Sequence, residues 1–258
     1  MGALTCEAGD VARELQQVAR NLAETSVPGS AAQRTAERLG SEPLDVGPFL
    51  QSALDGDAQA IARAAAERDL DPSALTQLLE LALQPVLWEA AARCASITDL
   101  DRWDRGYCPV CGAWPALAEL VGPERRRVLR CGRCGTAWSW LILLCPYCGN
   151  DDHRTLGTLT AASSVRPGAA SPTRGEPHAE RVDTCERCHG YVKAIGTFTP
   201  HPAVGLAAED VASIHLDLGA REAGYTRPGT VEVETAGIPR LVREGRTVRP
   251  DEPAIQLD

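Results

Sequence analysis

Four Cys-x-x-Cys pairs in one stretch of the chain constrain its fold more than any other feature. The pairs are Cys108/Cys111, Cys131/Cys134, Cys145/Cys148 and Cys185/Cys188, and together they use eight of the ten cysteines. Two residues between the thiolates allow both to reach one ion, and a glycine after the second cysteine permits the tight turn beneath it. In two pairs the sequence reads CPxCG, with Gly112 and Gly149 at that position. The pairs therefore predict two metal sites with four thiolates each.

The spacing of the pairs favours a sequential grouping of the ligands. This grouping places Cys108, Cys111, Cys131 and Cys134 on one ion, and Cys145, Cys148, Cys185 and Cys188 on a second ion. The first set encloses 19 residues between its pairs, inside the range of about 15–20 that is typical of zinc ribbons. The second set encloses 36 residues, and a segment of low complexity at 161–180 accounts for the excess. Interleaved grouping, as in cross-brace domains, and nested grouping remain alternatives.

A tetrahedral set of four sulfurs suits zinc or a single iron. We therefore expect two metal ions, iron or zinc, one in each site. Aromatic residues gather near the pairs, and we expect them to pack a small domain that has little other core. They are Tyr107, Trp114, Trp138, Trp140 and Tyr147.

Other chemistries of paired cysteines fit this sequence less well. A thioredoxin-like redox pair lies in a βαβ pattern, which does not surround these pairs. Cys185-Glu186-Arg187-Cys188-His189 matches the C-x-x-C-H motif of haem attachment, but the three sister pairs lack the histidine and we find no export signal. His153 and His189 follow pairs closely, yet each site already has four thiolates. We expect these histidines beside the sites rather than on the ions.

The sequence does not predict an enzyme. Catalytic metal sites keep an open coordination position, whereas four thiolates close it. We find no pattern of a nucleophilic triad, a phosphate-binding glycine loop or paired carboxylates, and so we expect no catalytic residues.

The first hundred residues carry helical signals. One apolar stripe recurs at spacings of three and four residues, as on one face of a helix: Val11, Leu15, Val18 and Leu22. Asp71 and Pro72 are typical of a helix start, and four leucines follow on one face. Gly40 is placed to end an earlier helix, and Pro85 to end or kink the later one.

Beyond residue 100 the helical period gives way to strand and turn signals. The expected strands are Arg127–Arg130, Thr136–Leu144, Leu156–Thr160, Arg181–Thr184 and Tyr191–Phe198. The strand Thr136–Leu144 would run straight into Cys145 and so couple the two sites. Residues 161–180 predict a mobile insertion, and Ala207–Ala223 predicts a helix before a proline-rich tail.

The expected fold class is therefore α+β. An N-terminal all-α helical domain (1–100) precedes a first metal ribbon with four cysteines (101–144) and a second metal ribbon with four cysteines (145–199) that contains the insertion 161–180. A C-terminal helix and tail (200–258) complete the chain.

Charge and apolar content suggest a cytoplasmic protein. The N-terminus has neither a basic nor an apolar signal region, and no apolar run approaches the ~20 residues that span a bilayer. We therefore expect no membrane insertion and reduced thiols. The net charge is −9, although 13 basic and 9 acidic residues make the stretch from Arg102 to Lys193 locally positive. The overall acidity weighs against nucleic acid as the main partner.

The chain resembles the formate dehydrogenase accessory protein family, FdhE. The resemblance rests on LLELALQPVLWEAAA, the CPVCG pair, CGRCGTAWSW leading into CPYCG, CERCHGYVKAI and the final ASIHLDLGAREAGY. It implies two rubredoxin-like units associated with iron, in a cytoplasmic protein that contacts the catalytic subunit of formate dehydrogenase before export. It also implies that all eight paired cysteines are ligands. The insertion 161–180 and the tail beyond Tyr225 depart from the family pattern.

The leading hypothesis is a non-enzymatic maturation factor, or chaperone, for formate dehydrogenase. One alternative is a rubredoxin-type protein for electron transfer or redox sensing. Another is a zinc-ribbon adaptor that contacts nucleic acid through the arginines between Arg125 and Arg133.

Overall fold

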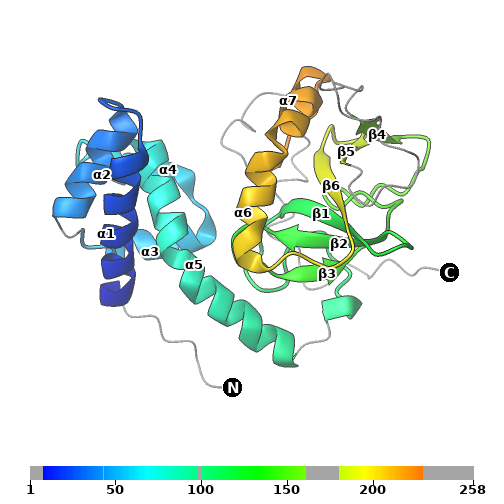
Figure 1. The fold of residues 1–258 in the computed structure, drawn as a ribbon, viewed down its shortest axis with the longest axis horizontal. Coiled ribbons are helices and arrows are strands. Elements are labelled where there is room, and N and C mark those ends of the chain that lie inside the picture. The colour runs from blue at the N-terminus through cyan, green and yellow to red at the C-terminus, as the bar shows by residue number, and fades with distance from the viewer. Residues whose placement is uncertain (1–7, 43, 98–99, 161–179, 229–258) are drawn as a thin grey trace. The chain divides into compact units, whose positions relative to one another are not determined.

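The computed structural model describes residues 8–42, 44–97, 100–160 and 180–228 (Figure 1). The chain divides into two compact units, Met1–Ala90 and Ala91–Asp258, which are described separately. Most of the predicted insertion, at 161–179, and the tail from residue 229 lie outside the described residues. The domain boundaries given above stay predictions.

The first unit is helical, as the sequence predicts. Its helices are α1 (Ala8–Thr25), α2 (Ala31–Ser41), α3 (Gly47–Asp55), α4 (Ala58–Ala66) and the start of α5 (Pro72–Ile97). Asp71 caps α5, since its Oδ1 accepts a hydrogen bond from the Ala74 amide at 2.8 Å. The leucine face of α5 is fully buried: Leu75, Leu78, Leu79 and Leu83.

One of the expected helix ends in this unit is wrong. Gly40 does not end α2, which runs on to Ser41. Its role is close packing, because a Cβ at Gly40 would come within 3.0 Å of the Arg20 side chain on α1. Pro85, expected to end or kink its helix, lies inside α5, and the helix continues past it to Ile97. A kink at Pro85 stays a prediction.

The second unit is built on one six-stranded sheet with the order β3-β2-β1-β6-β5-β4. The first cysteine ribbon supplies β1 (Pro115–Val121), β2 (Arg126–Cys131) and β3 (Ala137–Ser139), which pair antiparallel. The second supplies β4 (Leu156–Thr160), β5 (Arg181–Cys185) and β6 (Tyr191–Thr197), also antiparallel. Parallel pairing of β1 with β6 joins the two ribbons. Each ribbon therefore has the same order: cysteine pair, strand, strand, cysteine pair, strand.

Two expected elements of this unit differ from the structure. The strand predicted over Thr136–Leu144 is only three residues long, and a turn at residues 142–144 follows it. The helix predicted over Ala207–Ala223 is two helices, α6 (Ala203–Ala212) and α7 (Ile214–Glu222), separated at Ser213. A short helix, η1 (Leu100–Arg102), packs against β3.

A buried ionic cluster holds α6 and α7 on the sheet, where α7 packs on β5 and β6 (Figure 1). Lys193 on β6, the single lysine of the chain, is fully buried. Its Nζ lies 2.7 Å from a carboxylate oxygen of Asp210 on α6 and 2.7 Å from one of Asp217 on α7. Arg227 pairs with both aspartates, at 2.8 and 3.2 Å. Such mutual pairing is what makes burial of these charges tolerable. The α+β prediction, with N-terminal helices, cysteine ribbons and a helical C-terminal part, is confirmed.

Candidate metal centres

The four cysteine pairs adopt one common turn. In each, the amide of the first cysteine donates a hydrogen bond to the carbonyl oxygen five residues later. These bonds run from Cys108 to Ala113 (2.8 Å), Cys131 to Thr136 (2.9 Å), Cys145 to Asn150 (2.9 Å) and Cys185 to Gly190 (3.0 Å). The repeated closure means that all eight thiols are presented by the same local fold.

The fourth residue after the first cysteine is left-handed in every turn. It is Gly112 (φ 70°), Gly135 (φ 71°), Gly149 (φ 66°) or His189 (φ 53°). Glycine adopts this conformation at little cost. His189 therefore occupies the position that is glycine in the other three turns. Its place directly after Cys188 reflects the shape of the turn and does not indicate haem attachment. Its ring is exposed and lies 6.2 Å from that of Tyr225.

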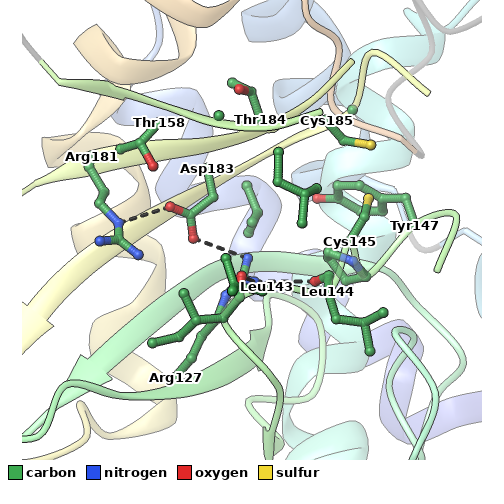
Figure 2. A pocket seen from close by; sticks show the side chains of 16 residues that line it. Arg127, Leu143, Leu144, Cys145, Tyr147, Thr158, Arg181, Asp183, Thr184 and Cys185 are labelled. Carbon is green, nitrogen blue, oxygen red and sulfur yellow. Dashed lines mark hydrogen bonds and ion pairs between the residues drawn. The ribbon is translucent and has the colours of Figure 1, made fainter. Parts of the chain in front are cut away.

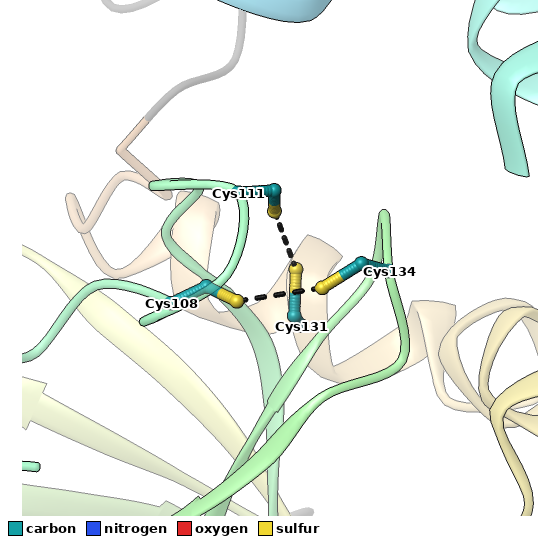
Figure 3. A group of neighbouring side chains, drawn as sticks. All are labelled: Cys108, Cys111, Cys131 and Cys134. Carbon is teal, nitrogen blue, oxygen red and sulfur yellow. Dashed lines mark hydrogen bonds between the residues drawn. The ribbon is translucent and has the colours of Figure 1, made fainter. Parts of the chain in front are cut away.

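The turns come together in the sequential grouping. Cys108, Cys111, Cys131 and Cys134 form one group, and Cys145, Cys148, Cys185 and Cys188 form the other, with the sulfurs of each group within 4.8 Å of one another. Figure 3 shows the first group, whose four sulfurs converge from two turns. Three thiols of each group are buried; Cys111 and Cys148 are half-buried.

The distances between sulfurs fit a tetrahedral ion. Metal–sulfur bonds of about 2.3 Å place the four sulfurs about 3.8 Å apart. The Sγ atoms of Cys145 and Cys188 are 3.7 Å apart, and those of Cys148 and Cys185 are 3.8 Å apart. The two corresponding distances in the first group are both 3.4 Å. Each group could therefore hold one metal ion after little or no movement.

Polar hydrogens point at several of the sulfurs. The Val110 amide donates to Cys108 Sγ at 3.4 Å, and the Thr136 hydroxyl lies 3.0 Å from Cys134 Sγ. The Asn150 amide group donates to Cys185 Sγ at 3.4 Å and to the Thr155 hydroxyl at 2.8 Å. Such contacts stabilise thiolates and tune a bound metal. Sequence reasoning missed Thr136 and Asn150, although both occupy the position that closes a cysteine turn.

The crowding of the four thiols in each group also favours a bound cation. Hydrogen bonding with Cys145 lowers the pKa of Cys148 to about 2 and that of Cys185 to about 6. The same bonding with Cys148 raises the pKa of Cys145 itself. Four sulfurs this close cannot all ionise beside one another without a positive charge among them. A metal ion supplies that charge, and the donor set fits zinc or iron.

The two groups are joined by tight packing. The Trp114 ring makes edge-on contacts with Tyr107, with centroids 6.1 Å apart, and with Tyr147, 5.5 Å apart. Tyr147 lies between two ligands of the second group, and its hydroxyl donates to the Tyr191 carbonyl at 2.9 Å. Burial raises the pKa of Tyr147. A Cβ at Gly106 would overlap the carbonyl of Pro146. The turn of the first centre thus rests directly on a turn of the second.

Two of the arginines near the centres are buried and hold the fold together. Arg127 is 3 % exposed and pairs with Asp183 at 3.2 Å, while Arg130 is 4 % exposed and pairs with the fully buried Glu119. Glu119 also accepts from the amide and the ring of His201, at 2.8 and 2.7 Å. Two of the five arginines between 125 and 133 therefore cannot reach a phosphate backbone. This observation weakens the nucleic-acid interpretation.

Of the remaining histidine and cysteine residues considered as candidates, those that the structure describes belong to neither group of four cysteines. His153 is exposed, and Cys94 is half-buried. Cys6 and His178 lie outside the described residues. Within the part of the chain that the structure describes, no helix has the length and apolar character needed to cross a bilayer.

Comparisons with known proteins find similarity to one family. Residues 168–233 match the family model "FdhE, C-terminal domain". A protein named FdhE homolog from Aquifex aeolicus is 31% identical over 148 residues, which are 56% of this chain and 47% of the relative. An FdhE homolog from Pseudomonas aeruginosa is 31% identical over 186 residues, which are 69% of this chain and 56% of the relative. The chain thus spans about half the length of these relatives.

The fold is shared with a solved structure. The crystal structure of the FdhE protein from Pseudomonas aeruginosa superimposes with a TM-score of 0.52 and 22% sequence identity, covering 89% of this chain and 80% of that one. The comparisons agree with one another: the chain is similar to the FdhE proteins in sequence and in fold, and its residues 168–233 match the C-terminal domain of that family.

Proposed function

We propose that the chain is a non-enzymatic, metal-binding accessory protein for the maturation of formate dehydrogenase. It binds the catalytic subunit of that enzyme in the cytoplasm before the enzyme is active. The observation that carries the proposal is the pair of four-thiol groups at tetrahedral spacing, in a chain related to the FdhE proteins. The resident ions are two, iron or zinc, one held by each group of four cysteines.

The ligand sets support a role without catalysis at the metal. Four thiolates fill the coordination sphere of a tetrahedral ion, so neither substrate nor water has a position on it. What the ions supply is rigidity: each fixes two turns of the sheet unit, and the energy of metal binding becomes energy of folding. The residues around the centres then present a defined surface to the client.

A co-purification from the native host tests the proposal. The full-length chain, tagged and expressed at its natural level, is expected to recover the formate dehydrogenase catalytic subunit from cytoplasm. Deletion of the gene is expected to leave that subunit synthesised but inactive. A subunit that is fully active in the deletion strain, and never recovered with the chain, would show that the client is wrong.

A second candidate function is electron transfer or redox sensing of the rubredoxin type. It is favoured by the N–H···S bonds of Val110 and Asn150 and by the partial exposure of Cys111 and Cys148. Hydrogen bonds to sulfur and solvent access both set iron potentials. Protein purified without oxygen separates the two functions: charge-transfer bands that bleach on reduction support the redox role, and a colourless zinc protein contradicts it.

A further inference from the structure

Asn150 ties the two turns of the second centre together. It is 4 % exposed, and it ends the Cys145/Cys148 turn, where its carbonyl oxygen accepts a hydrogen bond from the Cys145 amide at 2.9 Å. Its side-chain amide reaches the opposite turn and donates to Cys185 Sγ at 3.4 Å. Figure 2 shows Cys145 and Cys185, one from each turn, beside the ring of Tyr147. One residue therefore closes the first turn of this centre and contacts a ligand of the second turn.

The orientation of the Asn150 amide is fixed by its neighbours. The Thr155 hydroxyl donates to the Asp152 carbonyl at 2.9 Å, so it can only accept from Asn150, at 2.8 Å. This contact directs the nitrogen of the amide, and not its oxygen, toward the Cys185 sulfur. The Asn150 Oδ1 accepts from the Asp152 amide at 3.4 Å. A rotated amide would place an oxygen against the sulfur, where two acceptors repel each other.

Thr155 adds a second link between the two turns. Its carbonyl oxygen accepts a hydrogen bond from the Glu186 amide at 2.9 Å, and Glu186 directly follows Cys185. Both links join protein atoms to protein atoms, so neither depends on the ion. A ligand set that is ordered in advance loses little conformational entropy when it binds.

The first centre has alanine at the position of Asn150. This residue, Ala113, closes its turn through the same backbone hydrogen bond, but its methyl group cannot donate to a sulfur. The polar contacts given above for the first centre are local, because the Val110 amide and the Thr136 hydroxyl each lie in the same turn as the sulfur they contact. The sulfur distances across the turns also differ: they are 3.4 Å in the first centre, but 3.7 and 3.8 Å in the second, where a tetrahedral ion requires about 3.8 Å.

We propose that Asn150 is a positioning residue of the second centre. It holds Cys185 in place for the ion, and its N–H···S bond stabilises the thiolate, so it strengthens metal binding at the second centre and not at the first. Loss of an outer contact to a metal ligand typically costs about 10–100-fold in metal affinity. The inference rests on the metal-binding part of the proposed function and does not depend on the client.

Titration of the full-length chain with Co²⁺ tests the proposal. Tetrahedral thiolate sites give Co²⁺ sulfur-to-metal charge-transfer bands, whether the native ion is iron or zinc. The chain is stripped of metal without oxygen, and Cys145→Ser/Cys188→Ser identifies the signal of the first centre. Asn150→Ala gives the second centre the residue type of the first, and is expected to weaken Co²⁺ binding there by about tenfold or more, with the first centre within about twofold of the wild type. The bands of the second centre are expected to move to lower energy, because the sulfur loses an N–H donor.

Two further variants separate hydrogen bonding from shape. Asn150→Asp keeps the shape but replaces the donor with an oxygen, and at about pH 8, where aspartate is ionised, it is expected to bind at least as weakly as Asn150→Ala. Thr155→Val removes the acceptor that orients the amide. It is expected to weaken binding in the same direction by a smaller factor, and it decides the question if neither Asn150 variant folds.

The matched control lies in the helical unit. Thr35 is also 4 % exposed, and its hydroxyl accepts a hydrogen bond from the Asp71 amide at 2.9 Å. Thr35→Ala therefore removes a buried side-chain hydrogen bond far along the chain from the cysteines, and is expected to leave both centres unchanged.

The outcomes separate this inference from the proposed function. An Asn150→Ala chain with wild-type affinity and band energies at the second centre overturns the role of Asn150 and leaves the metal centres standing. A loss of equal size at both centres also overturns it, because that loss would mean general destabilisation. A wild-type chain that binds no Co²⁺ at either group removes the metal-binding part of the proposed function, and this inference with it.

Discussion

His189 is held in a conformation that histidine seldom adopts. Its φ of 53° matches the glycines of the three sister turns, and a left-handed non-glycine residue costs roughly 1 kcal/mol. Its ring is exposed, and the thiols of the second group are complete without it. The histidine is therefore a tolerated occupant of a glycine position, rather than a ligand.

Substitution at this position tests that assignment. His189→Gly is expected to keep two ions per chain and an unfolding temperature no lower than that of the wild type, because the strain is relieved. His189→Val is expected to lower the free energy of unfolding by about 1–2 kcal/mol, since a β-branched residue is disfavoured at positive φ. Thermal unfolding with metal analysis measures both. Loss of an ion from the glycine variant would mean that the histidine binds metal.

Much at the residue scale is predictable from spacing. Two residues between thiols, and 19 between the first two pairs, indicate the ligands and their sequential grouping. The same alignment of turns would also have placed His189 opposite the glycines. The sulfur contacts of Thr136 and Asn150 are harder to foresee, since they depend on how far each turn is rotated toward its neighbour.

At the scale of elements, the two centres are coupled by packing and not by a shared strand. The sequence pattern of Trp138, Trp140 and Ile142 resembles an alternating strand, but the hydrogen bonds of Arg127 with the carbonyls of residues 141, 142 and 144 hold that segment in a turn instead. Contact passes through Gly106 against Pro146 and through Trp114 against Tyr147. Long-range contacts of this kind leave no local signal in the sequence.

A larger residue at Gly106 should therefore disturb both centres. Gly106→Val is expected to accelerate release of both ions to a chelator by about tenfold or more, because its side chain displaces the Cys145–Pro146 backbone. The matched control is Gly219→Val, where nothing lies within 4 Å of the added Cβ. Release is followed with a colorimetric chelator under anaerobic conditions. A variant that releases both ions at the wild-type rate would show that the contact does not couple the centres.

At the scale of the molecule, the sheet unit is a repeat. Two ribbons of the same order meet along β1 and β6, whose paired residues lie about 76 positions apart, as Leu117 and Lys193 do. The α+β class and the helical N-terminal part follow from periodicity and capping signals. The joining of the two ribbons into one sheet does not follow from such local signals, because parallel pairing between strands so far apart in sequence depends on the packing of the whole unit. The break at Ser213 between α6 and α7 was not predictable either, because neither a glycine nor a proline stands at that position.

The joined sheet also explains why two of the five arginines between residues 125 and 133 are unavailable to a ligand. Arg127 forms an ion pair with Asp183 on β5, and Arg130 forms one with Glu119 on β1. Their charges hold strands and turns together around the two centres.

Metal analysis of the full-length chain, purified without oxygen, tests the two closed centres most directly. The wild type is expected to carry two ions of iron or zinc per chain. Cys108→Ser/Cys134→Ser and Cys145→Ser/Cys188→Ser are each expected to lower that content, to one ion or less, because each removes two of the four thiols of one group. A wild type with no bound metal, or variants that both keep two ions, would contradict the assignment of these eight cysteines as ligands.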